Sequence, residues 1–210
     1  MVQDGTVLSR ISIDIEKNNL FYVYVERRAR AMNENERKMW EKCAAFHGHE
    51  CGGLALGFKA AMYAEKVLGA GFSRDEELIC ISENDACCVD AIQVLLGCTA
   101  GKGNLFFHLT GKIAFTFFSR DTGDSIRIIQ RSDHPKNMSR AEEMKYYLSL
   151  PPEEIYEQTE VKLRIPGRAV LSSSVKCDDC GEETGELWIR CVEGRKVCPD
   201  CFRKYHRIFL

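Results

Sequence analysis

Apolar residues recur every three or four positions in several stretches of the chain, the spacing that puts them on one face of a helix. The first such stretch begins near Asn33, and its apolar face holds Met39, Trp40, Cys43 and Phe46. The pattern predicts helices over residues 33–46, 52–68, 86–97 and 139–150, and a short helical turn over 151–157.

Residues with special capping roles stand at the ends of these predicted helices. The Gly52-Gly53 pair precedes one apolar run, and Gly69 and Gly71 follow it as a C-terminal stop. The other end signals are Asp85 as a candidate N-cap, Gly97 as a stop, and Ser139 with Glu142 as a capping box. These signals favour separate helices joined by short loops.

Short apolar or alternating runs between the helices predict strands. They cover residues 77–82, 105–109, 112–118, 125–130 and 160–165, and ambiguous strand-like runs lie at 8–15 and 18–26. We expect one hairpin turn around Thr110-Gly111 and another at residues 120–124. Helices mixed with hairpins predict an α+β fold with a mixed, largely antiparallel sheet.

The 11 cysteines fall into two groups, which indicates a chain in two parts. Six lie between Cys43 and Cys98, and five lie between Cys177 and Cys201. The stretch "PGRAVLSSS" between the groups is rich in proline, glycine and serine, as linkers are. We therefore predict an N-terminal extension (1–30), an α+β core domain (31–165), a linker (166–175) and a small four-cysteine module (176–210).

Composition places the 210-residue chain among ordinary globular proteins, with 45% hydrophobic and 29% charged residues. A formal net charge of −2 gives no field that would attract nucleic acid or an acidic membrane. No apolar run is long enough to span a bilayer, and the first ten residues do not resemble a secretory signal. We expect a cytoplasmic protein with no membrane association and no nucleic-acid partner.

The most specific motif is the pair of C-x-x-C sequences formed by Cys177 with Cys180 and Cys198 with Cys201. In a chain without expected disulfides, this spacing is typical of a four-thiolate zinc site. A hairpin between the two pairs, followed by a predicted helix after Cys201, indicates a treble-clef-like module that binds structural Zn²⁺. Rubredoxin-like iron is the alternative metal. Cys191 is expected to be packed in the hairpin.

The basic residues near the end of this module are too few to form a surface for nucleic acid. They are Arg203, Lys204 and Arg207. We expect the module to have a structural role or to bind a protein partner.

A second group of possible ligands occurs in "AAFHGHECGGLALGFK", where His47, His49 and Cys51 stand at alternate positions. In an extended segment all three side chains share one side, and in a helix His47 still aligns with Cys51. Cys51 stands where a helix begins, and backbone N–H groups there stabilise a thiolate. Such a group suits a metal ion or an activated nucleophile. Simple packing, with a hydrogen-bonded histidine and a tight glycine turn, is the third interpretation.

Two further segments carry candidate site residues. On the helix "CCVDAIQ", Asp90 and Gln93 share a face, and Asp90 in an apolar stretch is not explained by packing. The loop "GCTAGKGN" lacks the spacing of a nucleotide phosphate loop, but Thr99 and Lys102 are candidates for holding an anion.

Together these motifs resemble the FmdE family of proteins associated with formylmethanofuran dehydrogenase, over roughly residues 35–205. The resemblance is carried by "FHGHECGGLALGFKA", "CCVDAIQVLLGCTAGKGNL" and "GKIAFTFF", and by "CDDCGE" with "CPDC" in the module. Family members usually have proline where this chain has Gly52. The resemblance implies an α+β core that is commonly dimeric. It also implies a site built from the histidine-cysteine motif and the aspartate helix, and a link to molybdenum or tungsten formylmethanofuran dehydrogenase operons in methanogens and other anaerobes. It supplies no reaction.

Three hypotheses follow for function. The first is a metal-binding protein with a second metal ion at His47, His49 and Cys51, supported by Cys88, Asp90 or Cys98. The second is a thiol enzyme with Cys51 as the nucleophile, a neighbouring histidine such as His49 as its base or counter-ion, and Asp90 in support. In that enzyme Lys102 or Thr99 would hold an anionic substrate. The third is a homodimeric adaptor that binds a protein partner through the zinc module.

Overall fold

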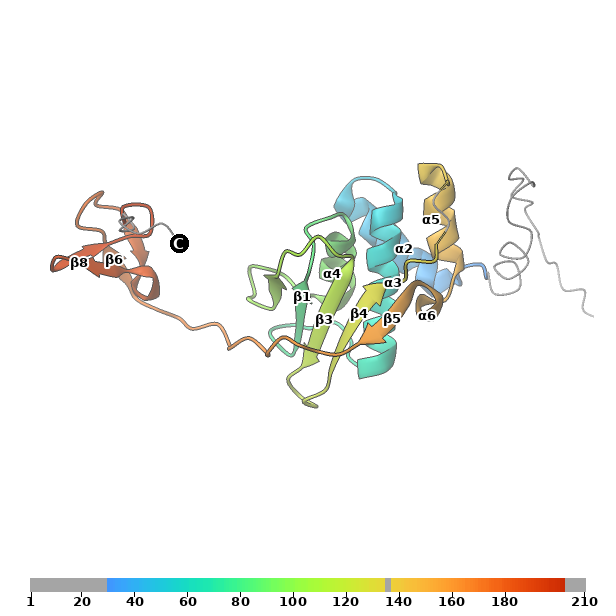
Figure 1. Ribbon diagram of the computed structural model, residues 1–210, viewed down its shortest axis with the longest axis horizontal. Coiled ribbons are helices and arrows are strands. Elements are labelled where there is room, and N and C mark those ends of the chain that lie inside the picture. Colours follow the sequence, from blue (N-terminus) through green and yellow to red (C-terminus); the bar gives the residue numbers. More distant parts are fainter. Residues whose placement is uncertain (1–29, 135–136, 203–210) are drawn as a thin grey trace, which may run out of the picture. The chain divides into compact units, whose positions relative to one another are not determined.

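The computed structural model describes residues 30–134 and 137–202. The chain divides into two compact units, with the boundary along the sequence between Pro166 and Gly167 (Figure 1). The N-terminal extension and its two strand-like runs, and the predicted helix after Cys201, lie outside the described residues. Among the helices of the described ranges, none has the length and apolar character needed to cross a membrane.

A five-stranded sheet forms the first unit and confirms the predicted α+β class. The strands are β1 (Leu78–Ser82), β2 (Leu105–Phe107), β3 (Ala114–Ser119), β4 (Ser125–Gln130) and β5 (Tyr156–Thr159). Their order is β2-β1-β3-β4-β5, with only the β1–β2 pair parallel. The sheet is therefore mixed but largely antiparallel, as the sequence predicts.

The helices gather against one face of this sheet (Figure 1). They are α2 (Glu34–His47), α3 (Gly52–Leu68), α4 (Cys88–Leu96), α5 (Arg140–Ser149) and the short α6 (Pro152–Ile155). Leu78 and Cys80 of β1 face the helical core, whereas Ile79 and Ile81 join a smaller cluster with Val161 and Leu163. The segment after β5 therefore covers part of the other face.

Helices α3 and α4 pack unusually close because of one glycine. A Cβ at Gly57 would lie 1.9 Å from the backbone oxygen of Cys88, so no side chain fits there. This contact sets the beginning of α4 beside the beginning of α3. Local sequence signals thus build two helices, and Gly57 decides how near they come.

Four sequence-based expectations about the elements are wrong. Residues 105–109 do not form a hairpin with the next strand, because β2 pairs with β1 and β3 lies on the other side of β1. The last strand of this sheet is β5, which comes earlier in the chain than the predicted strand at 160–165. Its first residue, Tyr156, is fully buried and donates a hydrogen bond to the Leu56 carbonyl, which fixes this segment at the sheet. Cys87, not Asp85, is the N-cap of α4, and Phe46 is 60% exposed.

The second unit is built from two small hairpins. Strands β6 (Ser174–Lys176) and β7 (Glu183–Gly185) form the first, and β8 (Arg190–Val192) and β9 (Arg195–Val197) form the second. Strand β6 begins inside the predicted linker, and Cys191 is exposed instead of packed. Only Cys177, Val197 and Cys198 form the buried centre among the residues described there. Apolar packing alone is thus a weak source of stability for this unit.

Candidate metal centres

Cys177, Cys180, Cys198 and Cys201 converge in the second unit, with all four sulfur atoms within 4.8 Å of one another. The first hairpin carries Cys177 and Cys180, and the second leads into Cys198. Zinc bonds to thiolates of about 2.3 Å place tetrahedral ligands within roughly 4 Å of each other. The Cys180 and Cys198 sulfurs are already 3.9 Å apart. The cluster is therefore a metal-binding site of the structural four-cysteine type.

Backbone hydrogen bonds prepare this cluster for a cation. N–H groups of Cys180 and Cys198 point at the Cys177 sulfur, the second at 3.3 Å, and they lower the pKa of Cys177 to about 6. Hydrogen bonds from Cys198 and its neighbours raise the pKa of Cys201 in turn. Negative charge concentrated among four sulfurs is relieved when a metal ion binds.

The second group of ligands lies between two helices of the first unit. His47 is the last residue of α2, Gly48 turns the chain with φ of 87°, and Cys51 is the N-cap of α3. One ligand atom from each of His47, His49 and Cys51 lies within 4.8 Å of the others. His47 Nε2 is 3.9 Å from the Cys51 sulfur, and the two imidazole rings are 4.4 Å apart. The three predicted donors are therefore neighbours.

Asp90 of α4 orients the His47 ring by contacting the ring nitrogen that does not face Cys51. Its Oδ2 atom is 2.7 Å from His47 Nδ1 and accepts a hydrogen bond from the Nδ1–H group, which leaves Nε2 free to face Cys51. Gln93 donates to the other Asp90 oxygen at 3.0 Å and holds the carboxylate in place. A carboxylate that hydrogen-bonds the outer nitrogen of a histidine is the usual support of a metal-ligating imidazole.

The donor set fits a metal ion of borderline softness. Two imidazoles and one thiolate suit Zn²⁺, and three protein ligands leave a fourth position open. The Cys51 sulfur also accepts a hydrogen bond from the Leu54 N–H at 3.3 Å, which holds the sulfur at the beginning of α3. His49 is exposed, and His47 and Cys51 are half-buried, so the group can be reached from solvent.

Of the three other cysteines that the sequence places near this group, Cys87 borders the site, whereas Cys88 and Cys98 are buried in the core. Cys88 donates to Asn84 Oδ1 and Cys98 to the Leu78 carbonyl, and burial raises the pKa of each thiol to about 12. Neither takes part in the site. Cys87 is half-buried beside Cys51, and burial together with the charge and hydrogen bond of Cys51 raises its pKa. The "CC" pair in the sequence does not show which of the two cysteines faces the site.

The structure does not bring Thr99 and Lys102 to the histidines. The Lys102 ammonium donates to the Ser73 carbonyl at 2.7 Å, and the Thr99 hydroxyl accepts the Lys102 N–H. Their loop is fixed at the Leu78 end of β1 by Asn104, whereas α4 begins beyond the other end of that strand. Anion binding by these two residues stays a prediction, at a place separate from the histidines.

Glu143 of α5 approaches the site in a way that the sequence does not reveal. A Cβ at Gly52 would lie 2.9 Å from its carboxylate, so the carboxylate occupies the space beside the residue after Cys51. Burial of the ring is the main reason that the pKa of Tyr147 is raised to about 12, and the negative charge of Glu143 is the second. The glycine after the motif cysteine is thus in contact with a charged side chain.

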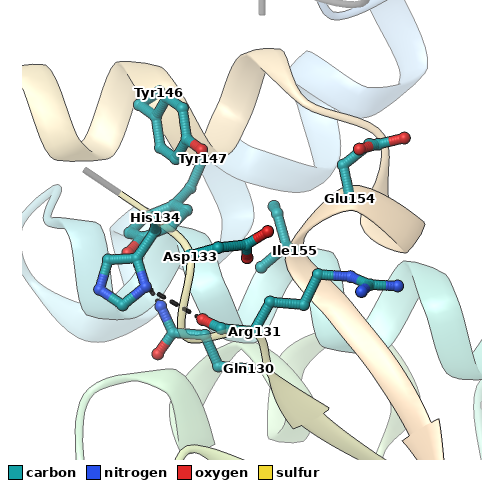
Figure 2. Close-up of a pocket in the computed structure, with 8 residues that line it drawn as sticks. All are labelled: Gln130, Arg131, Asp133, His134, Tyr146, Tyr147, Glu154 and Ile155. Atoms are coloured by element: carbon teal, nitrogen blue, oxygen red, sulfur yellow. Dashed lines mark hydrogen bonds between the residues drawn. The ribbon is translucent and has the colours of Figure 1, made fainter. Parts of the chain in front are cut away.

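A small pocket in the first unit is lined in part by Tyr147 (Figure 2). Figure 2 shows the His134 ring near Tyr147, with His134 Nδ1 3.0 Å from the Arg131 carbonyl. Its lining residues are Gln130, Arg131, Asp133, His134, Tyr146, Tyr147, Glu154 and Ile155. None of these residues belongs to the candidate metal centres.

Comparison with known proteins adds a family and two relatives. A family model described as "FmdE, Molybdenum formylmethanofuran dehydrogenase operon" matches residues 46–176. A "Probable S-adenosyl-L-methionine-binding protein" of Archaeoglobus fulgidus is 27% identical over 194 aligned residues. That alignment covers 78% of this chain and 52% of the relative, so the chain spans about half the relative's length.

Among solved structures, the fold is similar to a "tungsten formylmethanofuran dehydrogenase subunit e (fmde)-like protein" from Syntrophus aciditrophicus. The TM-score is 0.62 at 24% sequence identity, and the match covers 82% of this chain and 95% of the other. At that identity the likeness concerns the fold.

Proposed function

Because this chain belongs to the FmdE family and is a metal-binding protein, we propose that it carries two metal ions with separate roles. The four cysteines of the second unit hold structural Zn²⁺. His47, His49 and Cys51 hold a second, more accessible metal ion, which the protein handles for, or in association with, a molybdenum or tungsten formylmethanofuran dehydrogenase-like system. The description of the matching family supports that association.

The observation that carries this proposal is the convergence of three donors with Asp90 behind them. Ligand atoms within 4.8 Å of one another need only small side-chain movements to reach one ion. The 2.7 Å contact between Asp90 and His47 presents Nε2 to that ion. A metal bound there would act as a Lewis acid or be passed on through its open position.

Metal analysis of full-length variants tests the proposal. We expect two metal ions per chain in the native protein and one in the double variant Cys177→Ser, Cys180→Ser. Adding Cys51→Ser to the double variant is expected to remove the remaining ion, whereas adding Cys88→Ala, which changes a buried neighbour, is not. Co²⁺ loaded into the double variant would show sulfur-to-metal absorption that disappears with Cys51→Ser. A double variant that binds no metal would refute the core site.

A thiol enzyme is the second candidate function, and the Leu54 N–H bond to the Cys51 sulfur favours it. In that case Cys51 is the nucleophile and His47 or His49 is the base that serves it. Alkylation of the metal-free protein at mildly acidic pH distinguishes the two. Selective labelling of Cys51, much faster than that of exposed Cys191, supports the thiol enzyme. Equal rates at the two cysteines count against it.

We further propose a cytoplasmic homodimer whose zinc module binds a protein partner. The family resemblance is the support for dimerisation, and the exposed side chains of Leu187 and Trp188 support partner binding.

The adaptor hypothesis predicts that His49→Ala and Cys51→Ser leave the dimer and its partner binding intact. Light scattering of these variants, and of the native chain, measures the dimer directly.

A further inference from the structure

Two cysteines from different helices border one small space in the first unit. Cys51 is the N-cap of α3 and Cys87 is the N-cap of α4. A Cβ placed at Gly53 would lie 3.8 Å from the Cys87 sulfur and 3.9 Å from the Cys51 sulfur. The same Cβ would lie 3.1 Å from the Cys87 Cβ, tighter than normal packing allows. The absence of a side chain at Gly53 therefore leaves room for the two thiols to meet.

The helix packing described above keeps these thiols together. Gly57 lies one helical turn after Gly53 and holds α3 against the backbone of Cys88. The residue before Cys88 is therefore kept beside the first turn of α3. Both Cys51 and Cys87 are half-buried, whereas Cys43, Cys80, Cys88 and Cys98 are buried. Among the described cysteines of the first unit, this pair combines closeness with access to solvent.

We propose that Cys51 and Cys87 form a reversible disulfide that excludes metal from the His47, His49 and Cys51 site. The exclusion of metal rests on the proposed function, because Cys51 cannot be a thiolate ligand and part of a disulfide at the same time. The pair thus makes metal occupancy of the core site dependent on the redox state. The four-cysteine site, once it holds its metal, is not part of this exchange.

The reaction needs a two-electron oxidant, for which we name a low-molecular-weight disulfide such as oxidised glutathione. One cysteine thiolate attacks the oxidant, whose sulfur–sulfur bond breaks, and one thiolate leaves. The second cysteine then attacks the protein sulfur of the mixed disulfide and expels the other thiolate. Two cysteine thiols and one oxidant disulfide become one protein disulfide and two small thiols. A reducing dithiol reverses both steps.

Oxidation of the full-length chain, loaded with Zn²⁺ at its four-cysteine site, tests the inference. After incubation with oxidised glutathione, free thiols are alkylated and the digest is analysed by mass spectrometry. We expect Cys51 and Cys87 to lose their free thiols together, and a peptide cross-linked between them to appear, in the native protein and in Cys88→Ala. In Cys87→Ser we expect Cys51 to stop at the glutathione mixed disulfide. Absence of the cross-linked peptide in the native protein would overturn the inference.

Metal binding by the same samples separates this inference from the proposed function. We expect the oxidised chain to bind one Zn²⁺ fewer than the reduced chain, and a dithiol to restore it. An oxidised, cross-linked chain that binds as much Zn²⁺ as the reduced chain would overturn the claimed exclusion. If the reduced chain binds Zn²⁺ at the core site but never forms the cross-link, the proposed function stands and the disulfide does not.

Discussion

His47 shows how one contact assigns a role that the residue type leaves open. A histidine near a cysteine can pack, act as a base or bind a metal. The 2.7 Å contact of its Nδ1 with Asp90 fixes the proton on the far side of the ring, so Nε2 is offered to the Cys51 side. Asp90 itself lies in an apolar helix, and this contact explains why a carboxylate is placed there.

Asp90→Asn should therefore weaken metal binding without changing the fold. The amide cannot stabilise the imidazole as a carboxylate does, and such changes behind a ligand typically cost about 10–100-fold in metal affinity. Competition with a chromophoric chelator, in the variant that lacks Cys177 and Cys180, measures the loss. Gln93→Ala is the matched control, since it removes only the outer hydrogen bond and should have a smaller effect. Equal affinity in Asp90→Asn and the native chain would argue against His47 as a ligand.

Lys59 is a charged residue in the helical core and is only 2% exposed. Burial lowers its pKa from 10.5 to about 8, although the nearby Glu36 carboxylate opposes the shift. Glu36 already forms an ion pair with Arg30. Lys59 is thus a destabilising group at neutral pH, because the folded state binds its proton more weakly than the unfolded chain does.

The sign of this effect can be measured. Between pH of about 8 and 10.5 the unfolded chain binds more protons at Lys59, so its contribution to the free energy of unfolding rises with pH. Lys59→Met should be more stable than the native chain at pH 7, by up to about 3 kcal/mol. The difference should shrink above pH 8 and vanish near pH 10.5. Urea denaturation of both proteins across this range checks it, and a difference independent of pH would contradict the assignment.

Helix α3 joins the fold and the site in one element. Cys51 is its N-cap, Gly52 and Gly53 lie in its first turn, and Gly57 lies in its second turn. Gly53 leaves space for two thiols, Gly57 sets the distance to α4, and Gly52 accepts the approach of Glu143. The glycines that look like helix breakers in the sequence are therefore positions of close approach.

Gly52→Pro should stabilise this helix. Gly52 is the first residue of α3, where proline is favoured, and Cys51 before it is already extended with φ of −155° and ψ of 167°. The flexible Glu143 side chain can move away from the new ring. We expect a gain of about 0.5–1 kcal/mol from the stiffer unfolded chain. Thermal unfolding measures it, with Gly53→Pro as a control that should destabilise because its Cβ meets Cys87 at 3.1 Å.

The two units of the whole chain differ in how they are stabilised. The first has an extensive apolar core between its helices and sheet, whereas the second buries only Cys177, Val197 and Cys198 among its described residues. A unit with so little apolar core depends on its metal for folding. The units should therefore respond differently to loss of metal.

Removal of metal with a strong chelator should unfold the second unit and leave the first folded. Hydrogen exchange measured by mass spectrometry is expected to show complete loss of protection in peptides from 174–202. Peptides from α3 and β3 should keep their protection. The Cys177→Ser, Cys180→Ser variant should show the same pattern without chelator. Protection in 174–202 that survives chelation would mean that metal is not needed there.

Local spacing along the chain was enough to specify the helices, most strands, the α+β class and the four-cysteine site. Apolar periodicity and caps mark the helices, and each C-x-x-C turn brings its own two sulfurs together. Which residues from distant segments meet became visible only in the folded molecule. Asp90 contacts a histidine 43 residues away, Cys87 and not Cys88 faces Cys51, β2 pairs with β1, and Lys102 is bound to Ser73. Such meetings depend on how closely helices and strands pack, and local spacing does not encode that packing.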